Sequence, residues 1–297
     1  MPGFKHKIIF PFCLLLLLFA CNENVETEDN SATETDSVKN EERMADTKKV
    51  FYSVPSPIEM GSLLKRSGAS YDLKILNPVE NLSQYSSSEV KAMNLGVYGT
   101  DMSVASIFEQ NQETMLYLKC VSKLSKSIGI SGAFDENTAA RIEENAGNKD
   151  SLLQIISEAY WEADAFLKQE KRQNVSCLII AGGWIEGLYI ATQIADVVKN
   201  NQEIITRIGE QKLSLTNLIK LIETNKTDDS PLLVLDELKS LSTVYDKVTY
   251  SKAAVEVKTD AAKKMTTLSS ASKIIVSPEQ LSEIKAKIGS IRNNIIK

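Results

Sequence analysis

Apolar residues recur every three or four positions along most of the chain, which is the spacing of a helix with one buried face. The C-terminal segment shows it most clearly, at Leu281, Ile284, Ile288, Ile291 and Ile295. Three earlier stripes follow the same rule, at Leu116, Cys120, Leu124 and Ile128; at Ile204, Ile208, Leu215, Leu218 and Ile222; and at Val234, Leu238, Leu241, Tyr245 and Val248. Each stripe predicts an amphipathic helix that packs against other helices.

Helix-start and helix-stop signals frame these stripes. A capping serine, a proline at the first helical position and a box-closing Glu or Gln occur together in Ser56-Pro57-Ile58-Glu59 and in Ser277-Pro278-Glu279-Gln280, and Ser230-Pro231 repeats the first half. Glycines typical of helix ends stand at Gly68, Gly129 and Gly147. Only the short segments 72–76, 255–257 and 274–276 have the alternation or apolar clustering of strands.

One predicted helix, Asn174 to Val198, is apolar on nearly every side, which in a soluble domain indicates a central helix surrounded by neighbours. Glu186 interrupts the apolar run, so a core helix is favoured over a membrane span. Gly183 and Gly187 form a G-x-x-x-G pattern on which a second helix can approach closely. The sequence therefore predicts an all-α fold, with residues 51–297 forming a single compact bundle of about eight helices around this central one.

A second helix, about Ser87 to Glu109, has a composition similar to that of the central helix. Each contains glycines, a tyrosine and one carboxylate within an apolar stretch, which leaves an internal duplication open. The carboxylates are Asp101 and Glu186, each with a tyrosine one turn away, Tyr98 and Tyr189. A buried carboxylate must be paired, hydrogen-bonded or protonated, because burying a bare charge costs several kcal/mol.

Three interpretations of these acids are open. Asp101 and Glu186 can be satisfied by neighbours such as the tyrosines, anchor a ligand pocket, or act as paired catalytic acids. An all-oxygen metal site would require further acids, such as Glu158, Glu162 or Asp164, although the first two have the spacing of an exposed helical face. Trp161 and Trp184 are expected to pack in the core, with Trp184 also a candidate for lining a ligand site.

The first fifty residues differ from the rest. Residues 1–20 combine a basic start with a short apolar run, which is typical of a cleaved signal peptide. Leu18-Phe19-Ala20-Cys21 resembles the lipobox of bacterial lipoproteins, which implies that Cys21 becomes the lipidated N-terminus. Residues 22–49 are acidic and polar with almost no apolar side chains, so 21–50 is expected to be a flexible tether between the lipid and the folded domain.

Charge and histidine content exclude several functions. A net charge of -5, a pI near 5.3 and 6% aromatic residues argue against nucleic-acid binding. His6 is the only histidine, and it leaves with the signal peptide, so the mature chain has no Ser-His-Asp triad and no histidine-based metal site. No cofactor is indicated. The remaining cysteines, Cys120 and Cys177, lie in apolar stretches as free buried thiols or, in an oxidising envelope, as a disulfide.

The chain also resembles helical lipoproteins of Bacteroidota, in Tyr52-Ser53-Val54-Pro55-Ser56-Pro57, Leu95-Gly96-Val97-Tyr98 and Gly183-Trp184-Ile185-Glu186. The resemblance implies a lipid anchor in the outer membrane, facing the periplasm or the cell surface, and brings no activity with it. The function expected first is a non-catalytic module that binds a small ligand or an envelope protein. The alternative is an envelope hydrolase or lyase that uses the buried carboxylates.

Overall fold

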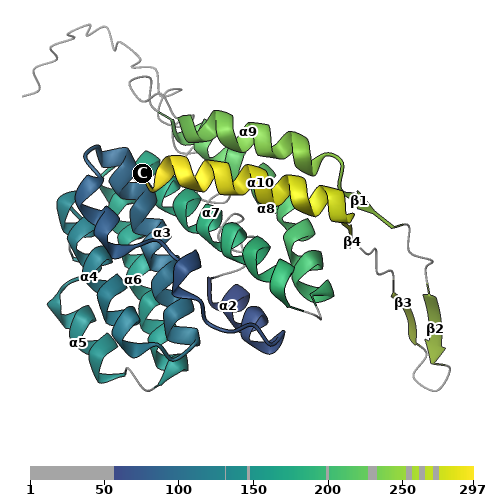
Figure 1. Ribbon diagram of the computed structural model, residues 1–297, viewed down its shortest axis with the longest axis horizontal. Helices are drawn as coiled ribbons and strands as arrows, with labels where there is room; N and C mark the ends of the chain where they lie inside the picture. The colour runs from purple at the N-terminus through teal and green to yellow at the C-terminus, as the bar shows by residue number, and fades with distance from the viewer. Residues whose placement is uncertain are drawn as a thin grey trace, which may run out of the picture. The chain divides into compact units, whose positions relative to one another are not determined.

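The computed structural model describes residues 57–130, 132–145, 148–198, 201–226, 233–251, 256–260, 265–269 and 274–297. Within these ranges the chain forms nine α-helices: α2 (Pro57–Arg66), α3 (Ser88–Ile107), α4 (Asn111–Ser127), α5 (Glu136–Glu144), α6 (Lys149–Gln169), α7 (Gln173–Val197), α8 (Gln202–Asn225), α9 (Leu233–Tyr245) and α10 (Pro278–Ile295). Two short 3₁₀ helices, η1 (Leu73–Ile75) and η2 (Val79–Gln84), precede α3. The predicted all-α class is confirmed (Figure 1).

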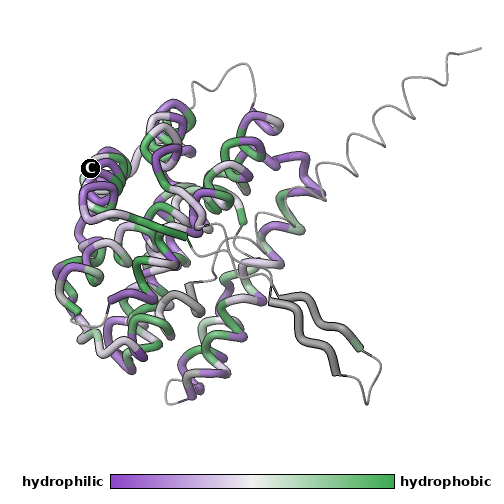
Figure 2. Tube along the Cα trace, turned by 90° about the vertical axis from the view of Figure 1, so that its right-hand side faces the viewer, coloured by the Kyte–Doolittle hydropathy of each residue, from purple (hydrophilic) through white to green (hydrophobic). Residues whose placement is uncertain are grey.

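Helix α7 is the central helix that the sequence predicts. It packs against α2, α3, α6, α8 and α10 (Figure 1), and most of its apolar side chains are buried. In the described part of the chain it is also the one helix long and apolar enough to span a membrane, yet 72% of that apolar window is buried inside the protein. Helix α3 is buried along most of its length as well. Most of the outer helices alternate between hydrophobic and hydrophilic residues, as the colours of Figure 2 show, so they can pack with one face against their neighbours and meet solvent with the other.

Glycines allow α3 and α7 to cross at very close range. A Cβ atom at Gly96 would lie 2.0 Å from the carbonyl oxygen of Ile179, and one at Gly182 would lie 1.9 Å from that of Met93. A Cβ atom at Gly183 would lie 3.4 Å from the carbonyl oxygen of Gly96, which is ordinary contact, whereas one at Gly187 would have open space beside it. Of the two glycines predicted to allow close approach of a second helix, Gly183 is therefore confirmed and Gly187 is wrong.

The predicted caps are confirmed wherever they lie within the described residues. Ser277 and Gln280 form a full capping box at the start of α10, with Pro278 in the first turn. Gly68 and Gly129 have φ angles of 84° and 76°, the left-handed conformation that ends a helix at low cost in glycine. Ser56, Ser230-Pro231 and Gly147 lie outside the described residues.

The apolar stripes are buried with one exception. All the predicted positions on α8, on α9 and its following turn, and on α10 are buried or nearly so. On α4 the prediction is wrong for Leu116, which is 46% exposed, while Tyr117, Leu118 and Val121 are buried beside Cys120 and Leu124. Two apolar stripes overlap on this helix, and the stripe that contains Tyr117 is the one that packs against α3.

Strands are few in the described ranges. β1 (Thr249–Tyr250) pairs antiparallel with β4 (Ile274–Ile275), and β2 (Glu256–Asp260) pairs antiparallel with β3 (Met265–Ser269). The predictions at 274–276 and 255–257 each overlap a strand, although residue 255 lies outside the described residues. The prediction at 72–76 is wrong, because Asp72 accepts a hydrogen bond from the Lys74 backbone and starts η1 instead.

Candidate functional site

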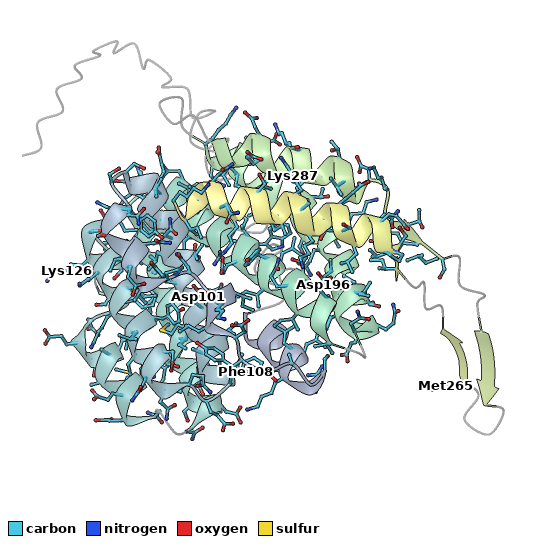
Figure 3. The ribbon with its side chains drawn as sticks, in the orientation of Figure 1. Asp101, Phe108, Lys126, Asp196, Met265 and Lys287 are labelled. Atoms are coloured by element: carbon cyan, nitrogen blue, oxygen red, sulfur yellow. The ribbon has the colours of Figure 1, made fainter. Side chains whose placement is uncertain are left out.

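Asp101 and Glu186, the two acids singled out from the sequence, meet in the centre of the protein. Asp101 lies on α3, and Glu186 lies on α7 beyond the glycine crossing that brings the two helices together. Both side chains are 0% exposed, and their carboxyl groups are within hydrogen-bonding reach of each other. Figure 3 marks Asp101. The helix crossing thus converts two distant sequence positions into one acidic pair.

Arg292 from α10 neutralises Glu186. Its guanidinium donates two hydrogen bonds to Glu186, from Nε to Oε2 at 2.7 Å and from Nη2 to Oε1 at 2.8 Å. Arg292 is only 5% exposed, donates from Nη2 to the carbonyl oxygen of Ile75 at 3.2 Å, and lies 4.2 Å from the centre of the Tyr189 ring. This bidentate geometry is the strongest form of an arginine–carboxylate pair.

Sequence reasoning missed Arg292, although a signal was present. The residue stands four positions after Ile288 and directly after Ile291, so it lies at the edge of the buried stripe of α10. A buried carboxylate on the central helix requires a partner, and an arginine at a core edge is well suited to supply it. We define Asp101, Glu186 and Arg292 as the acid–arginine cluster.

Asp101 has a different environment from Glu186. Its Oδ2 accepts a hydrogen bond from the backbone N–H of Asn77 at 3.2 Å, while its buried Oδ1 has no donor. Burial and the adjacent Glu186 charge raise the pKa of Asp101 well above its ordinary value, and the opposing effects of Arg292 and the Asn77 N–H are smaller. The protonated form of Asp101 therefore persists to a higher pH than that of an ordinary aspartate.

The tyrosines considered as possible partners of the acids make other contacts. The hydroxyl of Tyr98 donates to the carbonyl oxygen of Pro78 at 2.9 Å, and Tyr189 offers its ring face to Arg292. One-turn spacing places each tyrosine near its acid along the helix. The groups that the tyrosines and the acids contact nevertheless come from other elements. Tyr189 nevertheless belongs to the surroundings of the cluster, through its contact with the cation.

A second layer of polar groups ties the end of α10 to this region. Asn94 donates from its side chain to the carbonyl oxygen of Ile295 at 2.8 Å. Asn77 donates to the hydroxyl of Tyr85 at 2.9 Å, and that hydroxyl donates to the carbonyl oxygen of Ile296 at 3.5 Å. The carbonyl groups left open at a helix C-terminus are thus satisfied by buried side chains from α3 and from the segment before it.

The two tryptophans differ. Trp184 is 3% exposed and donates from its indole to Oε1 of Gln211 at 3.1 Å, so the prediction that it packs in the core is confirmed. Trp161 is 43% exposed, and the same prediction is wrong for it. The ring of Trp184 contributes to packing between α7 and α8 and does not line the acid–arginine cluster through any contact described.

The other acids considered from the sequence do not gather into a site. Glu158 pairs with Arg141 at 2.7 Å on the surface, and Glu162 is exposed. Asp164 is buried, where it accepts from Lys168 and from the hydroxyl of Ser176, both at 2.5 Å. Among the described residues, no group of three His, Cys, Asp or Glu side chains is arranged to hold a metal ion.

The two cysteines of the helical region are separate free thiols. Cys120 on α4 and Cys177 on α7 are both buried, and neither forms a disulfide. Burial raises the pKa of Cys120 to about 11 and that of Cys177 to about 12. Of the two alternatives left by the sequence, the free thiol is the one found, and thiols with such pKa values are poor nucleophiles at neutral pH.

The chemistry open to the acid–arginine cluster is limited by its closure. Paired-carboxylate catalysis requires two carboxyl groups that converge on a substrate, and here they converge on each other and on Arg292. No side-chain surface of either acid is exposed.

Comparison of the chain with models of known protein families, with curated proteins and with solved structures finds no significant match.

Proposed function

We propose that this protein is a cell-envelope lipoprotein, held in the outer membrane by lipid on Cys21, whose helical domain is a non-catalytic module for binding a small ligand or an envelope protein. The lipobox-like Leu18-Phe19-Ala20-Cys21 and the acidic residues 22–49 support the anchor and the tether. A tether of this kind would hold the domain clear of a membrane, since a flexible chain of about thirty residues spans about 30 Å.

The closed acid–arginine cluster is the main observation that weighs against catalysis by the buried acids. An enzyme that used Asp101 and Glu186 would need both groups accessible to substrate, whereas both are 0% exposed and engaged with Asn77 and Arg292. The mature chain would also lack histidine, so its repertoire of general bases would be restricted to carboxylates, amines and phenols. The hydrolase or lyase alternative therefore has less support.

Metabolic labelling with a radioactive fatty acid, followed by cell fractionation, tests the anchor. The wild-type chain should be labelled and should stay in washed outer membranes. Cys21→Ser should lose the label and leave the membrane fraction, because an unacylated chain keeps no stable anchor. Cys13→Ser is the matched control, and it should behave as wild type. Unlabelled wild-type protein, or a Cys21→Ser variant that remains in washed membranes, would contradict the proposal.

Protease treatment of intact cells then determines the orientation. Digestion of the helical domain in intact cells indicates a surface location, and protection until the outer membrane is opened indicates a periplasmic one.

The binding role itself is tested by purifying the protein from detergent-solubilised envelopes after cross-linking in living cells. The wild-type chain should recover one defined partner or ligand. Cys21→Ser, secreted into the same compartment, should recover the same one, which would support a binding role of the domain itself.

A further inference from the structure

We propose that Asp101 and Glu186 share a single proton, and that this shared proton makes the attachment of helix α10 to α3 and α7 sensitive to pH. The acid pair lies where these three helices meet, and Arg292 connects it to α10. The inference goes beyond the proposed binding role, because it concerns how the fold responds to its surroundings.

The balance of charge around the pair supports this proposal. The titratable groups that act on Asp101 from the neighbouring elements are Glu186 and Arg292 together with Tyr71, Tyr85, Tyr98, Tyr117, Tyr160 and Cys120. Tyr189 adds its ring against the guanidinium. In this set the cation is Arg292. The six phenol and thiol groups named above are neutral, because burial raises the pKa of each of them. One cation can neutralise one carboxylate.

The hydrogen bonds identify which acid is neutral. Both oxygens of Glu186 accept hydrogen bonds from Arg292, so Glu186 is the carboxylate whose negative charge Arg292 neutralises. Asp101 has one oxygen on the Asn77 N–H and one buried oxygen, Oδ1, without a donor. A proton on Oδ1 turns that atom into a donor, and the carboxylate of Glu186 is the acceptor within reach. Protonation of Asp101 thus completes the hydrogen bonding of the site.

Loss of that proton would place two adjacent negative charges in a site closed to water. Two carboxylates in one buried site cannot both ionise cheaply, so Asp101 holds its proton to a higher pH than an ordinary aspartate. The same site holds the last turns of α10, through Arg292 to Ile75 at 3.2 Å and through Asn94 to Ile295 at 2.8 Å. Rising pH is therefore expected to loosen α10 before the apolar contacts of the other helices fail.

The sign of the effect is fixed by the direction of the shift. A carboxyl whose pKa is raised by folding stabilises the fold most at acid pH, and this contribution falls as the pH rises from the ordinary carboxyl pKa, about 4, to the raised value. An ionised, salt-bridged aspartate would give the opposite trend. The pH dependence alone thus separates a shared proton from an ordinary buried ion pair.

Urea unfolding of the full-length protein in detergent, at a series of pH values from about 4 upward, tests the proposal. In Asp101→Asn the amide can donate to Glu186 and accept from Asn77 without a titrating proton. The folding constant of wild type divided by that of Asp101→Asn should fall about tenfold per pH unit until the raised pKa is reached. Asp164→Asn, which alters a buried acid paired with Lys168, is the matched control and should not produce this fall.

Infrared spectroscopy provides a direct readout of the proton. The folded wild type at neutral pH should show the carbonyl band of a protonated carboxyl, and Asp101→Asn should lack it while Asp164→Asn retains it. The band should disappear at alkaline pH together with hydrogen-exchange protection in α10. A ratio of folding constants that rises or stays flat with pH, or a folded wild type without the band, would overturn the proposal. The wild-type band decides the question even if Asp101→Asn fails to fold.

Discussion

The close crossing of α3 and α7 makes Gly96→Ala one of the most damaging small substitutions in the protein. The added Cβ would lie 2.0 Å from the carbonyl oxygen of Ile179 and 2.6 Å from the backbone nitrogen of Gly183. Those two atoms are four residues apart on α7, the spacing of a helical hydrogen bond, so they belong to rigid backbone that cannot rotate away. The helices would have to separate by about 1 Å to reach the shortest contact a Cβ tolerates, about 3.0 Å.

That separation would disturb the whole centre of the protein, because the same two helices carry Asp101 and Glu186. Overpacking of a core costs about 1 to 3 kcal/mol, and a clash with the rigid backbone of α7 should reach or exceed the upper end of that range. Gly187→Ala is the matched control. It places the same methyl on α7 where no atom lies within 4 Å, and it should stabilise the helix by up to about 1 kcal/mol.

Urea denaturation followed by circular dichroism measures both effects. Gly96→Ala should lower the midpoint with little change in the slope, and Gly187→Ala should leave the midpoint unchanged or raise it. Equal midpoints for the two variants would refute the close crossing. So would a Gly187→Ala variant that is the less stable of the two.

Two further predictions test single parts of the structure. Ser277→Ala removes the capping box of α10 and should lower the free energy of unfolding by about 1 kcal/mol, whereas Ser282→Ala, farther along the same helix, should cost less; equal losses in urea denaturation would contradict the cap. Acrylamide should quench the fluorescence of Trp161 strongly and that of Trp184 weakly, as measured in Trp184→Phe and Trp161→Phe, respectively; similar quenching of the two would contradict their 43% and 3% exposures.

Local patterns predicted the helices well, because the forces involved act within a few residues. The box of Ser277 and Gln280 and the isoleucine stripe of α10 depend on chain neighbours and on a period of 3.6 residues. The same local reasoning failed at 72–76, where the capping side chain of Asp72 favours a 3₁₀ turn over an extended segment. Leu116 and Trp161 show a related limit, since apolar character does not reveal which stripe the neighbouring helices cover.

The candidate site was predictable only in part. Burial of Asp101 and Glu186 followed from their apolar surroundings, but their partners did not, because Arg292 is 106 residues from Glu186 and Asn77 is 24 residues from Asp101. The tyrosines one turn away were the nearest candidates in the sequence. The choice of partner depends on how α3, α7 and α10 meet, which the pattern of a single helix does not contain.

A double-mutant cycle between Glu186 and Arg292 tests most directly whether the buried carboxylates form a structural cluster. Glu186→Leu and Arg292→Met should each lower the free energy of unfolding by about 3 to 5 kcal/mol, because each leaves a buried charge without its partner. The double variant, which buries no unpaired charge, should recover most of that loss. Single losses that simply add in the double variant, or that stay below about 1 kcal/mol, would contradict the central role of this pair.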